Sequence, residues 1–279
     1  MRHQQQRSYP IEAVILKHSD LGEADRILTL FTPQKGKFHA VAKGSRRPIS
    51  RKAGHLDLLT HSQLQMAQGR NLDIVTQAQS IENFLHLRDE LWHTTCAFYL
   101  AEMVDRFIEN DTQHPNVYRL LLEALRGLDS DALALQGQRA QEALSVEDEQ
   151  SRAQLLTRYF EINLLSYIGY EPVFRVCAHC GSELQPEENG FTPSLGGALC
   201  PRCSHLWAQA LSANALKVLR LLQRADDWQH VPRIRLTARL HAEIETAMHS
   251  LLRYHLERDL KSWSFLEMLR LDSRVREKN

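Results

Sequence analysis

The repeat of apolar residues changes near residue 81, and this change divides the chain into two kinds of structure. Before it, apolar runs are short and separated by turn formers, which is the pattern of β-strands. After it, apolar residues recur every three or four positions, as in IENFLHLRDELWHTTCAFYLAEMVDRFIE (81–109), which indicates amphipathic helices. The sequence therefore predicts an α+β protein, with a β domain over residues 1–80 and an α-helical domain over residues 81–279.

The first 80 residues contain five predicted strands, at 9–17, 27–31, 38–42, 56–66 and 72–78. Pro33 and Gly36 lie between the second and third strands and predict a hairpin there. Closing a small sheet removes its exposed edges, so we expect an OB-like β-barrel. An open five-stranded sheet and an SH3-like barrel are also compatible with this strand count.

The second part of the chain contains several predicted helices. After the first of them, a helix begins at residue 117 and is expected to end near Gly127, followed by an acidic connector over 129–149. Gly169 should end a helix over 153–170. Further helices are expected at 212–224 and within about 236–270.

Two Cys-x-x-Cys pairs, separated by 19 residues, interrupt the helical region. Together they match the template of a zinc ribbon, in which four thiolates surround one metal ion. We therefore predict one structural Zn²⁺ per chain in an inserted element over 175–206. A redox pair or free thiols are the alternatives, and neither pair has the βαβ context of a redox motif. The predicted ligands are Cys177, Cys180, Cys200 and Cys203.

The chain has zero net charge but an uneven distribution of it. Residues 1–80 contain twelve Lys or Arg and six acidic residues, so they carry +6 and the remainder carries −6. Within residues 35–52 there are seven basic residues and no acidic one. Such a run is typical of a surface that binds a polyanion, although a solvated loop is the simpler alternative. The candidate nucleic-acid-binding residues are Arg26, Lys35, Lys37, Lys43, Arg46, Arg47, Arg51, Lys52 and Arg70.

Aromatic rings near the predicted hairpin could stack on bases. Phe31, Phe38 and His39 are in reach, but an aromatic residue in a strand more often faces the core, and we expect this for both phenylalanines.

No residue arrangement in the chain is typical of an active site, so we predict a binding protein and not an enzyme. AKGSRR (42–47) lacks the spacing of a phosphate-binding loop. No apolar stretch reaches the roughly 18 residues that cross a bilayer, and the N-terminus is unlike a signal peptide. A cytoplasmic location without membrane contact is therefore expected.

Three stretches together resemble the bacterial recombination-mediator family RecO. They are GEADRILTLFTPQKGKFHAVAKGSRR (22–47), LWHTTCAFYLAEMVDRF (91–107) and YFEINLLSYIGYEP (159–172), the last leading into the cysteine pairs. The resemblance implies an N-terminal OB-fold, a helical domain with a zinc-binding insertion, binding of single- and double-stranded DNA, and annealing of complementary strands. It also implies a role in loading RecA at gaps near the nucleoid, with RecR and the C-terminal tail of single-stranded-DNA-binding protein as partners.

Two other functions remain alternatives at this point. A zinc-ribbon transcription regulator would need a recognition helix with base-reading side chains, and none is evident. A zinc-dependent nucleic-acid enzyme would need an open metal position and an acid–base glutamate.

Overall fold

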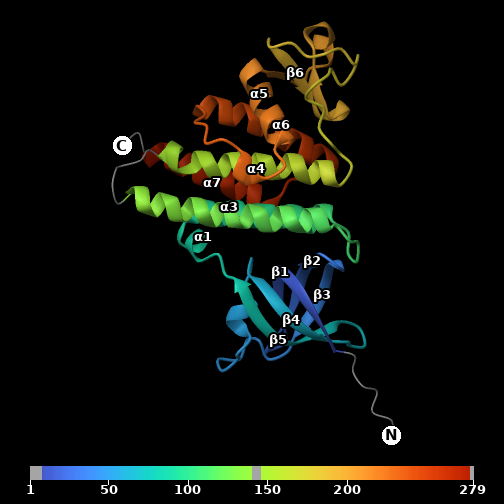
Figure 1. The fold of residues 1–279 in the computed structure, drawn as a ribbon, viewed down its shortest axis with the longest axis vertical. Helices are drawn as coiled ribbons and strands as arrows, with labels where there is room; N and C mark the ends of the chain where they lie inside the picture. Colours follow the sequence, from blue (N-terminus) through green and yellow to red (C-terminus); the bar gives the residue numbers. More distant parts are fainter. Residues whose placement is uncertain (1–7, 140–145, 277–279) are drawn as a thin grey trace. The chain divides into compact units, whose positions relative to one another are not determined.

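The computed structural model describes residues 8–139 and 146–276, which form two compact units (Figure 1). One unit contains the chain up to Leu85 together with Ala101–Leu122. The other contains His86–Leu100 and the chain from Glu123 onward. The proposed domain division after residue 80 stays a prediction.

The five N-terminal strands close into a barrel in the order β1-β2-β3-β5-β4, which confirms the predicted closure. Four of the five contacts are antiparallel, and β3 pairs with β5 in parallel. The alternative of an open sheet is therefore wrong. The strands are β1 (Ser8–Leu21), β2 (Asp25–Thr32), β3 (Gly36–Ala42), β4 (His61–Ala67) and β5 (Asp73–Glu82).

Strand β1 is long enough to pair with two neighbours. Its first half, Ser8–Val14, pairs with β4, and its second half, Val14–Leu21, pairs with β2. The register shifts between Ile15 and Lys17, which marks a bulge where the strand bends from one partner to the other. Alternate side chains then point into a buried core that includes Ile11, Ala13, Ile15, Leu28, Leu30, Phe38, Leu64 and Met66.

The predicted hairpin joins β2 to β3, and its turn depends on one glycine. Gly36 has a φ of +68°, and a Cβ there would lie 1.9 Å from the carbonyl oxygen of Thr112. No side chain fits that space. Thr32 completes the turn, because its Oγ1 accepts from the Lys35 amide and donates to the Gly36 carbonyl.

The helical region contains seven α-helices among the described residues. They are α1 (Leu85–Asp89), α2 (Leu91–Phe107), α3 (Pro115–Arg139), α4 (Val146–Tyr167), α5 (Ala213–Arg224), α6 (Ala238–Leu256) and α7 (Lys261–Arg276). Gly169, with a φ of +89°, follows the end of α4 and permits the Tyr170 amide to reach the Leu165 carbonyl, as predicted for a helix stop. No helix in the described ranges is both long and apolar enough to cross a membrane.

The predicted connector over 129–149 is wrong for most of its length, because α3 continues to Arg139 and α4 begins at Val146. Residues 140–145 lie outside the described residues. The helix continues past Gly127 despite the acidic composition because it has a buried apolar face. This face includes Leu128, Ala132 and Leu135, which are spaced as on one side of a helix. Gly127 is a packing position and not a stop signal. A Cβ there would lie 2.5 Å from Leu156 and 2.8 Å from Trp228.

The cysteine-containing insertion builds a three-stranded sheet in the order β7-β6-β8. The strands are β6 (Asn189–Thr192), β7 (Gly197–Leu199) and β8 (Gln209–Leu211), and both contacts are antiparallel. Phe174 and Phe191 are fully buried and stack at 6.4 Å between ring centroids. This sheet places the second cysteine pair directly after β7.

Candidate nucleic-acid interface and metal centre

The predicted cations lie along one continuous stretch of the barrel and at two further positions. Lys35 and Lys37 belong to the β2–β3 hairpin, and residues 43–52 form the loop that follows β3. Arg26 lies at the start of β2, and Arg70 lies between β4 and β5.

The loop after β3 is held in place by hydrogen bonds of its own backbone to the turn between β1 and β2 and to the first residue of β2. Gly44, with a φ of +67°, donates its amide to Asp25 Oδ1 at 2.8 Å, and the Arg46 amide donates to the Ala24 carbonyl at 3.0 Å. Ser45 is buried and its Oγ donates to the Ala42 carbonyl. The basic side chains of this loop are therefore carried on an ordered backbone.

Lys37 is a structural cation. Its side chain is 9% exposed, and Nζ donates to the backbone carbonyl of Asp105 and to Asp105 Oδ1, the latter at 3.2 Å. The Lys37 carbonyl accepts from the Asp111 amide at 2.7 Å. A phosphate cannot reach this ammonium group unless these contacts break.

Lys35 is held in a similar way but is partly open to solvent. Its Nζ donates to the Tyr9 hydroxyl at 2.9 Å and to Asp73 Oδ2 at 3.3 Å. It also lies 4.8 Å from the ring centroids of both Tyr9 and Phe38, in cation–π geometry. Its ammonium thus contacts residues of β1, β3 and β5.

Three further predicted cations have partners within the barrel. Lys52 Nζ donates to the Val75 carbonyl at 2.9 Å, and burial lowers the pKa of Lys52. Arg26 and Arg46 both pair with Asp20, at 3.6 and 3.4 Å, and Arg46 also donates to the Gly22 carbonyl. Asp20 partly neutralises this side of the basic stretch, a role that the sequence alone does not reveal.

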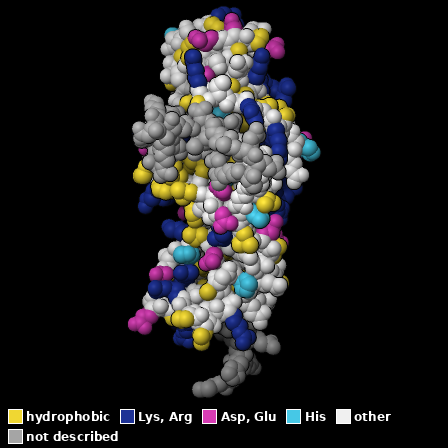
Figure 2. Space-filling model, turned by 90° about the vertical axis from the view of Figure 1, so that its left-hand side faces the viewer, with side chains coloured by type: hydrophobic (Ala, Val, Ile, Leu, Met, Phe, Trp, Pro, Cys, Tyr) yellow, Lys and Arg dark blue, Asp and Glu magenta, His cyan; other side chains and the backbone are white. Residues whose placement is uncertain are grey.

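The four remaining cations are exposed, and no ion pair is found for them among the described residues. Figure 2 shows that Lys and Arg side chains on the face drawn are dispersed among acidic, apolar and uncharged ones. Such dispersed charges can contact phosphates but cannot read base edges in a fixed pattern. The four are Lys43, Arg47, Arg51 and Arg70.

The aromatic residues near the hairpin do not form a stacking platform. Phe31 and Phe38 are buried, as expected for strand aromatics, and Phe31 packs against Tyr118 at 5.8 Å between ring centroids. His39 is exposed, but its Nδ1 is 3.2 Å from Thr29 Oγ1. The two phenylalanines are therefore not accessible for stacking on bases.

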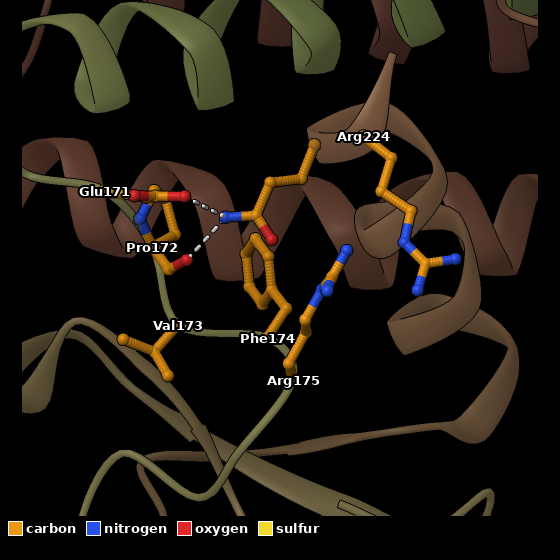
Figure 3. Close-up of a pocket in the computed structure, with 7 residues that line it drawn as sticks. Glu171, Pro172, Val173, Phe174, Arg175 and Arg224 are labelled. Atoms are coloured by element: carbon orange, nitrogen blue, oxygen red, sulfur yellow. Dashed lines mark hydrogen bonds between the residues drawn. The ribbon is translucent and has the colours of Figure 1, made fainter.

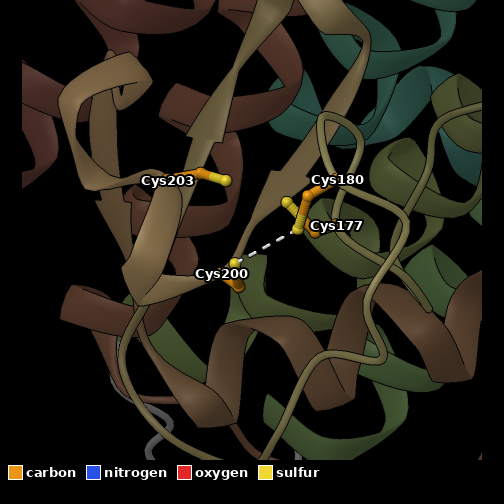
Figure 4. Close-up of side chains that lie close together, drawn as sticks. All are labelled: Cys177, Cys180, Cys200 and Cys203. Carbon is orange, nitrogen blue, oxygen red and sulfur yellow. Dashed lines mark hydrogen bonds between the residues drawn. The ribbon is translucent and has the colours of Figure 1, made fainter.

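The four predicted metal ligands come together in the insertion (Figure 4). Their sulfur atoms all lie within 4.8 Å of one another, and Sγ of Cys180 is 3.7 Å from Sγ of Cys200. A tetrahedral zinc site with Zn–S bonds of about 2.3 Å requires sulfur atoms about 3.8 Å apart. None of the five cysteines forms a disulfide, and the fifth, Cys96, is buried in α2.

Each cysteine pair lies on a tight turn that directs both thiols inward. In the first, the Cys177 amide donates to the Ser182 carbonyl, and Gly181, with a φ of +73°, donates to the Cys177 carbonyl. In the second, Pro201 follows Cys200 and the Cys203 amide donates to the Cys200 carbonyl. These two turns preform the geometry that a four-thiolate site needs.

The surroundings of Cys180 favour its thiolate, the form that binds metal, whereas burial and the neighbouring cysteines raise the pKa of Cys203 to about 12. A hydrogen bond from the Ser182 hydroxyl, 3.1 Å from Sγ, together with the Ser182 amide lowers the pKa of Cys180 to about 6. His179 Nδ1 lies 3.5 Å from Sγ of Cys203, and Arg202 is paired electrostatically with Cys200. The donor set therefore fits Zn²⁺, and four filled positions fit a structural and not a catalytic metal.

Comparison with known proteins agrees with both parts of this structure. The family model for the N-terminal domain of recombination protein O matches residues 7–84, and the model for its C-terminal domain matches residues 88–142 and 138–264. The chain belongs to the RecO family. The closed five-stranded barrel is accordingly the OB-fold of the RecO N-terminal domain.

Full-length relatives support the same assignment. The DNA repair protein RecO of Roseiflexus sp. is 38% identical over 266 residues, which cover 95% of this chain and 87% of the relative. That of Dehalococcoides mccartyi is 34% identical over 264 residues, covering 94% and 96%. The RecO-family chain thus has a role in DNA repair and recombination.

Proposed function

We propose that this RecO-family protein binds single- and double-stranded DNA through its barrel, anneals complementary strands and helps load RecA at gaps. The proposal rests on one observation, an ordered loop on a closed OB-fold that presents exposed cations to solvent. Lys43, Arg47 and Arg51 are its central residues; the proposal also includes Arg46 of the same loop and Arg70, which lies between β4 and β5.

The chemistry of annealing suits such a surface. Two strands repel each other through their phosphates, and cations that release bound counterions reduce this repulsion without selecting a sequence. We infer that the exposed cations do this, whereas the charge of Lys37, which is bonded to Asp105, stabilises the fold. The proposal therefore excludes Lys37 from direct phosphate contact.

The partners and the metal belong to the same proposal. We infer that RecR, RecA and the C-terminal tail of single-stranded-DNA-binding protein act with this chain in the cytoplasm near the nucleoid. We also infer that Zn²⁺ has a structural role, because four thiolates leave no position for a reacting water. Family membership does not favour the alternative of a transcription regulator.

The experiment is annealing of complementary oligonucleotides without a nucleotide cofactor. The wild type should accelerate duplex formation, and the variant K43Q/R47Q/R51Q should bind single strands about 100-fold more weakly at 0.1 M salt, with the salt slope reduced by about 2. Arg119→Gln, which changes an exposed cation of α3 in the same unit, is the matched control. Unchanged affinity and salt slope in the triple variant would refute the proposal.

A further inference from the structure

Helix α5 presents a basic face that the proposed barrel interface does not include. Its buried face consists of Ala215, Leu216, Val218, Leu219 and Leu222. Lys217, Arg220 and Arg224 follow one another at intervals of three and four residues, so they share the opposite face. The helix contains no acidic residue.

Arg220 is the fixed member of this face. Its Nε donates to the Phe174 carbonyl at 2.7 Å, and its Nη2 lies 3.3 Å from the Leu184 carbonyl and 3.4 Å from the Arg175 carbonyl. These bonds attach the segment that leads into the first cysteine pair to α5. They also bring Arg175 next to the basic face.

The three arginines are close enough to repel one another. Burial, and then the charges of Arg224 and Arg175, lower the pKa of Arg220, against an opposing effect of Glu183. Arg175 and Arg224 are exposed, and neither has an ion pair among the described residues. Arg224 lies in the last turn of α5, where a cation is favourable, but that position does not account for Arg175.

A cavity of about 410 Å³ lies beside this cluster. Its lining includes the side chains of Arg175 and Arg224, which Figure 3 shows extending into the same region. Its one acidic residue, Glu171, is held by Gln223, whose Nε2 lies 3.4 Å from Oε1 and 2.7 Å from the Pro172 carbonyl. The guanidinium groups therefore face a space that an anion could enter.

We propose that Arg175, Arg224 and Lys217 form a second phosphate-binding surface, which holds the backbone of one DNA strand while the barrel holds another. The inference rests on the proposed annealing function and adds a second strand site to it.

The arrangement of the charges favours a nucleic acid over an acidic peptide. Lys217 and Arg224 are seven residues apart, or about 10 Å along the helix axis, so the cations follow a line as backbone phosphates do. The aromatic ring of the cavity, Phe174, is buried, so it offers no exposed apolar anchor for a peptide side chain.

The experiment measures whether one chain holds two strands that cannot pair with each other. Donor- and acceptor-labelled oligothymidylates are added to the full-length protein, and energy transfer reports two strands on one particle. R175Q/R224Q should weaken binding of the second strand about 25-fold at 0.1 M salt, from two lost phosphate contacts. Affinity for the first strand should change less than twofold, and annealing should slow in parallel with the loss of the second strand.

Three controls make the outcomes distinct. Arg258→Gln changes an exposed cation of the same unit and should have no effect. R175K/R224K keeps both charges and should restore second-strand binding, which a merely structural role would not predict. Metal content and the thermal unfolding midpoint confirm that each variant is folded, and Arg220 is left intact because it holds three carbonyls.

The possible failures differ from one another. Wild-type protein that neither binds nor anneals DNA would overturn the proposed function itself. Wild-type protein that anneals, with R175Q/R224Q equal to it in energy transfer and rate, would overturn only the second site. Loss of binding to a labelled decaglutamate peptide, with both DNA measurements unchanged, would assign the surface to an acidic protein and would also overturn this inference.

Discussion

Replacing Lys37 and Lys43 in parallel separates cations that stabilise the fold from cations available to DNA. Both belong to the basic run 35–52, and a Lys→Met change removes the charge while keeping most of the apolar stem. Lys37 Nζ is bonded to the carbonyl and carboxylate of Asp105, whereas Lys43 is exposed and has no ion pair among the described residues.

The structure sets the expected size of each effect. Lys37→Met removes a charge-assisted hydrogen bond and leaves the Asp105 carboxylate, 24% exposed, without its cation, which should lower the free energy of unfolding by about 2–3 kcal/mol. Lys43→Met should change it by less than about 0.5 kcal/mol. Lys43→Met, but not Lys37→Met, should also remove one phosphate contact. It should weaken single-strand binding about 5-fold at 0.1 M salt and reduce the salt slope by about 0.7.

Urea unfolding and fluorescence anisotropy of a labelled oligonucleotide at several salt concentrations measure the two quantities. Asp105→Asn in the Lys37→Met background should recover part of the lost stability, because it removes the uncompensated charge. The reasoning is refuted if Lys37→Met weakens DNA binding and its salt slope while the unfolding midpoint stays unchanged.

Three other predictions concern the helical region and the metal centre. Burial and two nearby arginines lower the pKa of His241 to about 4. Between pH 6.5 and pH 4, His241 is therefore protonated in the unfolded chain and neutral in the folded chain. The free energy of unfolding should therefore fall as the pH drops from 6.5 toward 4, by about 2 kcal/mol at pH 5, and a pH series of urea unfolding should lose this component in His241→Gln. Gly127→Ala should lower the free energy of unfolding by about 1–3 kcal/mol through overpacking. Gly137→Ala, where a Cβ meets nothing within 4 Å, should raise it by about 0.5–1 kcal/mol. Equal shifts of the thermal unfolding midpoint in the two variants would contradict this. Cys180→Ser should lower zinc affinity in a chelator competition, and unchanged affinity would argue against the four-thiolate site.

Local patterns were sufficient for much of the fold. Turn formers at Pro33 and Gly36 predict the hairpin, and Gly169 predicts the end of a helix, because these residues restrict the backbone at their own positions. The cysteine spacing likewise predicts a cluster, since each pair is a short turn whose geometry depends on few neighbours. Gly127 is the counterexample. Its residue type predicts the end of a helix, but in the structure it allows close packing against Trp228, 101 positions away in the sequence.

The sequence by itself determined where strands give way to helices, which cysteines come in pairs and where positive charge accumulates, because each is a property of neighbouring residues. Tertiary structure alone decided the parallel contact between β3 and β5 that closes the barrel, and which basic residues remain free. Lys37 and Asp105 are 68 positions apart, so no local pattern predicts their pairing. A charged side chain is available to a ligand only if the fold does not place an opposite charge or a hydrogen-bond partner beside it. The fold forms such ion pairs between residues that are far apart in the chain.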